Sequence, residues 1–163
     1  MPNVVDIIRQ NHALEHATMH ILSRRHPYLR LAGRSTVGGF LIYGPVDTRD
    51  VAAAASEALA RLQQGEAYLA VHPRCGTNLA VTAVMAGGAA FGVGVVGRPK
   101  SRLDRLPLAL AVATVAALLA QPVGHKLQER ITTSPELEGA FIQEVIRMER
   151  GRITVHKVVV GRE

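Results

Sequence analysis

The 163-residue sequence is poor in cysteine and aromatic residues and contains no tryptophan. A single cysteine, Cys75, excludes an intrachain disulfide framework and a four-cysteine zinc ribbon. Aromatic residues make up 4% of the chain, so side chains on which nucleic-acid bases could stack are scarce. The net charge is +6, and only three of the 19 basic residues are lysine. The basic excess therefore does not by itself predict a nucleic-acid partner, and we expect none.

Charged residues are absent from two long apolar stretches, residues 79–97 and 106–124. A bilayer core of about 30 Å is crossed by about 20 helical residues, and both stretches approach that length. The loop between them is basic, with Arg98, Lys100, Arg102 and Arg105. We therefore predict a two-helix transmembrane hairpin, the alternative being a buried helical hairpin in a soluble core. The Gly88-x-x-x-Gly92 spacing lets membrane helices approach closely and predicts a homo-oligomer contact on that helix face.

A hairpin returns the chain to the side of the membrane that it left, so the segments on either side of it can fold together. The sequence thus predicts an α+β domain built from residues 1–78 and 125–163, with the hairpin, residues 79–124, inserted between them. Helices are expected from the Asn3 cap to Arg24, from the Asp47 cap to Gln64, and over 134–149. Strands are expected at 36–43, 67–71 and 152–160.

The first predicted helix carries the motif HALEH, in which His12 and His16 are four residues apart. Helical spacing puts these two imidazoles one above the other on one face, where they can hold one zinc ion. Glu15 lies beside them and is a candidate general base toward a water molecule. His20 continues the same face about 12 Å along the axis from His12, and we expect it not to share that ion.

A third ligand is expected from the segment HPRCGTN, residues 72–78, directly before the first apolar stretch. His72 and Cys75 are both good transition-metal ligands, and the sequence leaves open which of them binds. Thr77 and Asn78 are candidates for orienting a substrate. The alternative is that the histidines are polar surface residues and that Cys75 is a small buried apolar residue.

The order of these motifs resembles the YqhQ-like family of uncharacterised bacterial membrane proteins, which are described as predicted metal-dependent enzymes. That family's pattern is similar to H-G-A-E-H-K, then H-P-R-C-G-T-S, membrane helices and L-Q-x-x-T-T. Here Ala17 replaces the lysine, Asn78 replaces the final serine, and the last motif has one extra residue. The chain also resembles a shorter uncharacterised cyanobacterial-type family with an N-H-A-L-E-H-A-T motif. The positions that match the YqhQ-like pattern are His12, Glu15, His16, His72, Pro73, Arg74, Cys75, Gly76, Thr77, Leu127, Gln128, Thr132 and Thr133.

Together the sequence predicts a metal-dependent membrane protein, hydrolase-like in chemistry, that uses a divalent transition metal such as zinc. One alternative is a non-catalytic membrane scaffold whose His/Cys cluster stores or senses metal. Another is a soluble or peripheral domain whose arginines bind acidic lipid or nucleic acid. We expect the α+β domain to face the cytoplasm, because a thiolate ligand is safer from oxidation in a reducing compartment.

Overall fold

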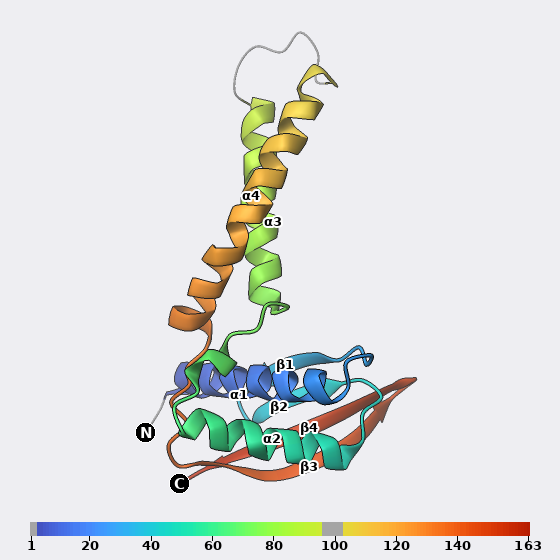
Figure 1. The fold of residues 1–163 in the computed structure, drawn as a ribbon, viewed down its shortest axis with the longest axis vertical. Coiled ribbons are helices and arrows are strands. Elements are labelled where there is room, and N and C mark those ends of the chain that lie inside the picture. The colour runs from blue at the N-terminus through green and yellow to red at the C-terminus, as the bar shows by residue number, and fades with distance from the viewer. Residues whose placement is uncertain (1–2, 96–102) are drawn as a thin grey trace. The chain divides into compact units, whose positions relative to one another are not determined.

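The computed structural model describes residues 3–95 and 103–163, and its elements are shown in Figure 1. The fold is mixed α and β, as the sequence predicted. The chain forms two compact units, one of Met1–His72 with Glu129–Glu163, and the other of Pro73–Gln128. Three of the four basic residues predicted for the hairpin loop, Arg98, Lys100 and Arg102, lie outside the described residues.

Two helices of the first unit begin where the sequence predicted. Helix α1 (Val4–Arg25) follows Asn3, whose side-chain oxygen accepts the N–H of Asp6 at 2.9 Å. Helix α2 (Thr48–Gln63) follows Asp47, whose carboxylate accepts the N–H of Arg49 at 2.8 Å. Each cap satisfies a backbone donor that the first helical turn would leave without an acceptor, which confirms both predicted helix starts.

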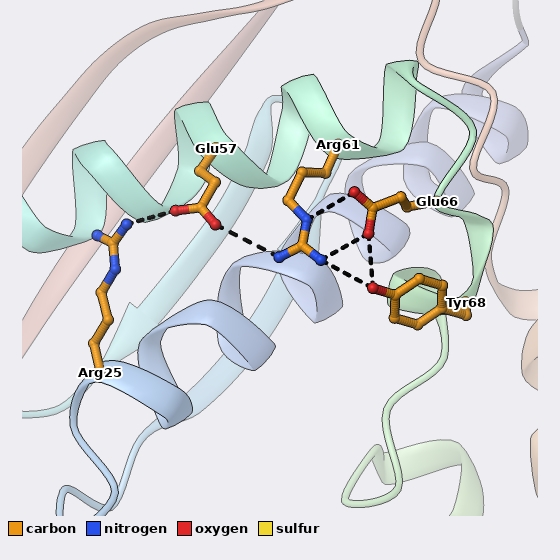
Figure 2. A network of polar contacts seen from close by, with 5 residues as sticks. All are labelled: Arg25, Glu57, Arg61, Glu66 and Tyr68. Atoms are coloured by element: carbon orange, nitrogen blue, oxygen red, sulfur yellow. Dashed lines mark hydrogen bonds and ion pairs between the residues drawn. The ribbon is translucent and has the colours of Figure 1, made fainter.

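An ion-pair network fastens the two helices to each other (Figure 2). Arg25, at the end of α1, donates to the carboxylate of Glu57 on α2 at 2.5 Å. The second oxygen of Glu57 lies 3.5 Å from Arg61, one turn further along α2. These partly exposed contacts add little stability individually, but they fix the register in which the two helices pack.

The sheet of the first unit has four antiparallel strands in the order β1-β2-β4-β3. The strands are β1 (Ala32–Thr36), β2 (Gly39–Tyr43), β3 (Ala140–Arg150) and β4 (Ile153–Arg162). Both helices contact the sheet, α1 at β1 and β2, and α2 at β3 and β4. The core between these layers includes Leu14 and Val51 from the helices and Phe40, Ile42 and Val158 from the strands, all fully buried.

Three sequence predictions in this unit are wrong. The helix predicted over 134–149 is largely strand β3, because residues 140–150 pair with the β-branched strand β4 across a turn at Gly151, where φ is +63°. The strand predicted at 67–71 is instead a 3-10 helix, η1 (Ala67–Ala70). The strand predicted at 36–43 begins at Gly39, and Thr36 belongs to the separate strand β1.

The second unit contains the two apolar helices, α3 (Gly76–Val95) and α4 (Leu106–Leu127). They run antiparallel and touch at both ends. A Cβ atom added to Gly124, near the end of α4, would overlap the side chain of Asn78 in the first turn of α3. At the other end, Arg105 donates to the carbonyl oxygen of Val93 at 3.1 Å. Within unit 2, the predicted helical hairpin is therefore present in the part of the chain described.

Both helices are long and apolar enough to cross a membrane. Only 6% of the most apolar 18-residue window of each is buried, which disagrees with the alternative of a buried core hairpin. Large side chains such as Leu79, Phe91 and Leu118 are each about 70% exposed. Apolar surface of this extent on a soluble chain needs a covering partner or a lipid phase.

Candidate metal centre

Helix α1 places His12 and His16 side by side, as their spacing predicted. Their ring centroids lie 4.3 Å apart at an interplanar angle of 60°, and their nearest ligand nitrogens are within 4.8 Å of each other. The side chain of His16 is buried and that of His12 is half-buried. One face of α1 thus presents two imidazoles at a spacing that a single ion can bridge.

Backbone carbonyl groups from two distant segments orient these rings. Nδ1 of His12 lies 2.9 Å from the oxygen of Thr132, and Nδ1 of His16 lies 2.7 Å from the oxygen of Ala70. Since a carbonyl oxygen can only accept, each Nδ1 carries the proton and each neutral ring has its lone pair on Nε2. Metal-binding histidines are held in this way, with one nitrogen donating to a carbonyl and the other left to coordinate.

His20 and His72 form a second contact in the same unit. Their ring centroids lie 4.7 Å apart, and the ring of His72 lies 5.8 Å from that of His16. His20 is also held by the backbone, with Nε2 at 2.8 Å from the oxygen of Val71. The sequence predicted that His72 lies near His16, but it set His20 aside because His20 is far along α1 from His12. The structure shows that the ring of His72 contacts both His16 and His20, which the spacing along α1 could not reveal.

Glu15, the candidate base, is 6% exposed and its carboxylate lies against β1. A Cβ atom added to Gly33 would overlap this carboxylate, so the strand leaves room for Glu15 only because it carries a glycine there. The side chain is therefore enclosed between α1 and the sheet.

Cys75, Thr77 and Asn78 all lie at the start of α3 in the second unit. Cys75 is buried, and its sulfur accepts the backbone N–H of Thr77 at 3.4 Å. The positive end of a helix dipole beside a sulfur atom is an environment that stabilises a thiolate. Asn78 donates to the oxygen of Pro73 at 2.9 Å and accepts from Gln128 at 2.8 Å. The amide of Asn78 thus holds the turn at residues 73–78 and ties it to the end of α4.

A charged network that the sequence did not reveal positions η1, the segment that ends just before His72. Arg61 on α2 donates through two nitrogens to the two carboxylate oxygens of Glu66, at 3.0 and 2.7 Å (Figure 2). Tyr68 donates to the same carboxylate at 2.7 Å. The hydrogen bond from Arg61 and that from Tyr68 lower the pKa of Glu66 to about 2. This network anchors the 3-10 helix whose Ala70 carbonyl then orients His16.

Comparisons with known proteins place these residues in a family. Residues 7–145 match the family described as domain of unknown function DUF6391. An uncharacterized protein of Picosynechococcus sp. is 41% identical over 148 residues, which cover 84% of this chain and 72% of that protein. No solved structure matches. The family match over residues 7–145 includes His12, His16, His72 and Cys75. The resemblance to the YqhQ-like family stays a prediction. On the extent of both matches, the chain belongs to the DUF6391 family.

Proposed function

We propose that this protein is a membrane-anchored metalloprotein that binds one divalent transition metal, preferentially zinc, through His12, His16 and Cys75. The observation that carries the proposal is the orientation of the two histidines. Each is fixed by a carbonyl group from a different part of the chain, Thr132 in one case and Ala70 in the other. Histidines that bind a metal characteristically donate their second ring N–H to a carbonyl or carboxylate, which fixes the orientation of the ring.

The distance between the rings fits a shared ion. A zinc–nitrogen bond of about 2.0–2.1 Å puts an imidazole centroid about 3.2 Å from the ion, so two imidazoles at a tetrahedral angle have centroids about 5 Å apart. The observed separation of His12 and His16 is 4.3 Å. A small rotation of either side chain brings the pair to the ideal value, so binding needs no movement of the helix.

Cys75 is our candidate for the third ligand. It is three residues beyond His72, which belongs to the same unit as the two histidines, so the chain itself keeps the sulfur within reach. The helix start and the Thr77 N–H favour a charged sulfur, which is the form that binds metal. Two imidazoles and one thiolate leave a fourth tetrahedral position for water or substrate, as in catalytic zinc sites. His72 is the alternative third ligand.

We further propose that the bound ion serves hydrolysis. A bound zinc ion supplies Lewis acidity, which makes water a better nucleophile at neutral pH. Glu15, whose carboxylate lies against Gly33 of β1, would have to turn toward the histidines to accept the proton of the attacking water. Thr77 or Asn78 would orient the substrate, with the Thr77 hydroxyl the better candidate because the Asn78 amide already makes two hydrogen bonds.

The lipid bilayer is the partner that best accounts for α3 and α4. At 1.5 Å per residue, the 20 residues of α3 extend about 30 Å, the thickness of a bilayer core. Resistance of the protein to extraction by alkaline carbonate tests the proposal, and release without detergent would contradict it. A cytoplasmic α+β unit and a homo-oligomer contact through Gly88 and Gly92 remain proposals. Space around both glycines is open, which is compatible with such a contact.

The decisive experiment compares Glu15→Gln with the double variant His12→Ala/His16→Ala in detergent-solubilised protein. We expect Glu15→Gln to keep its zinc and to lose turnover toward a panel of ester and peptide substrates, and the double variant to lose both. His26→Ala is the matched control, because this histidine also lies at α1 but pairs with Asp50. Full zinc content in the double variant would contradict the proposed site. Zinc binding without turnover of any substrate would favour the non-catalytic alternative.

A further inference from the structure

We propose that His20 and His72 form a second metal-binding position, separate from that of His12 and His16. The inference goes beyond the proposed function and does not depend on hydrolysis or on Cys75, and it assigns His72 to the second position instead of to the first ion. It rests on the contact between these two rings, on the backbone hydrogen bond that orients His20, and on their partial exposure.

The distance between the ring centroids of His20 and His72 is closer to the value expected for two imidazoles on one ion than the distance between those of His12 and His16. The centroids of His20 and His72 lie 4.7 Å apart, against the value of about 5 Å for two imidazoles on a tetrahedral zinc ion. The two rings come from segments more than fifty residues apart in sequence, α1 and the second residue beyond η1. Tertiary structure, rather than helical repetition alone, therefore brings them together.

The backbone contact of His20 selects its coordinating nitrogen. Nε2 lies 2.8 Å from the oxygen of Val71, so Nε2 carries the proton and the lone pair of the neutral ring is on Nδ1. This is the opposite arrangement to that of His12 and His16, which donate through Nδ1. The carbonyl belongs to the residue preceding His72, so the same hydrogen bond that orients one ring fixes the backbone that carries the other.

Burial separates the two positions in expected affinity. The first pair includes one buried ring, His16 at 2% exposed, beside the half-buried His12, whereas His20 and His72 are both half-buried. An ion at the second position would keep water in its remaining coordination sites, because two protein ligands leave a tetrahedral shell half filled. We therefore expect it to bind more weakly than the first ion and to exchange faster with solvent.

The rings of His12, His16, His72 and His20 form one continuous row, with successive centroids 4.3, 5.8 and 4.7 Å apart. The middle separation is the longest, which divides the row into two pairs rather than into one three-histidine site. The geometry assigns the half-buried pair of His20 and His72 to a second ion next to the first one, as in sites where two ions act on one substrate.

The test is the zinc stoichiometry of the full chain in detergent, measured by equilibrium dialysis over a range of free zinc concentrations. Gln replaces both histidines, because at position 20 its amide can still donate to the Val71 carbonyl and at position 72 it keeps a polar side chain of similar size. We expect two equivalents in the wild type, with the second at least about tenfold weaker. His20→Gln/His72→Gln should keep only the tight equivalent, and His12→Ala/His16→Ala only the weak one.

The four proteins separate the possible failures. If the site of His12 and His16 does not exist, the double variant at those residues binds as the wild type does, while His20→Gln/His72→Gln still loses the weak equivalent. Two equivalents in His20→Gln/His72→Gln would overturn the second position. So would a single wild-type equivalent that His20→Gln/His72→Gln retains, or loss of the tight ion in that variant while its circular dichroism and thermal unfolding match those of the His26→Ala control.

Discussion

A buried histidine outside the metal centre should make the stability of the α+β unit depend on pH. His156 on β4 is fully buried, and its Nε2 lies 3.1 Å from the hydroxyl of Thr48 at the start of α2. Its Nδ1 has no hydrogen-bond partner among the residues that the structure describes. Burial lowers the pKa of His156 below 6.5, and the positive charge of Arg147 across the strand pair lowers it further, while Asp47 opposes the shift.

The direction of the effect follows from the lowered pKa. Well above pH 6.5 the side chain is neutral in both the folded and the unfolded chain, so the folded state keeps its full stability. As the pH falls below that value, the unfolded chain takes up a proton that the folded chain refuses. The unfolding free energy should then decrease by as much as about 1.4 kcal/mol per pH unit until the folded-state pKa is reached.

The assay compares the wild type with His156→Leu, which is apolar at every pH. Urea unfolding in detergent micelles can be followed by tyrosine fluorescence, because the chain lacks tryptophan and its three tyrosines, residues 28, 43 and 68, all lie in the α+β unit. Between pH 6.5 and 5.5 the wild type should lose up to about 1 kcal/mol more than the variant. The six other histidines titrate in both proteins, so their contribution cancels in the difference. Parallel pH profiles for the two proteins would refute the reasoning.

Two glycines provide further tests of close packing, each with a control glycine that has open space. Gly33→Ala should push the Glu15 carboxylate away from β1 and lower the unfolding free energy by about 1–3 kcal/mol with zinc content unchanged, whereas Gly38→Ala should be near neutral. A neutral Gly33→Ala would show that Glu15 is not confined there. Gly124→Ala should separate α4 from the start of α3 and speed hydrogen exchange at that end of the helix pair, and Gly92→Ala should not. Equal exchange in the two would contradict the packing.

The elements that the sequence predicted correctly are those whose signals are local. The caps at Asn3 and Asp47 and the two uncharged stretches each require only neighbouring residues to recognise. Strand β3 was missed because AFIQEVIRMER has residues with good helix propensity and helix-compatible apolar spacing. Its pairing with β4 overrides that propensity, and no local pattern reports a cross-strand partner.

In the candidate metal centre, too, the sequence predicted the features that depend on neighbouring residues and missed those that depend on distant segments. The adjacency of His12 and His16 follows from helical spacing, and the sequence anticipated it. The carbonyl partners of these rings, Thr132 and Ala70, could not be anticipated, because backbone groups carry no sequence signal. The short strand predicted at 67–71 is a 3-10 helix fixed by the contact of Arg61 with Glu66, which depends on where α2 ends.

The most direct test of the metal centre is zinc K-edge X-ray absorption on protein loaded with one equivalent of zinc. Ligation by His12, His16 and Cys75 predicts a sulfur shell at about 2.3 Å and imidazole nitrogens at about 2.0–2.1 Å. The double variant His12→Ala/His16→Ala should lose this signature. A spectrum of oxygen and nitrogen ligands without sulfur would remove Cys75 from the site. A spectrum that the double variant leaves unchanged would contradict the central claim that the histidine pair on α1 binds the metal.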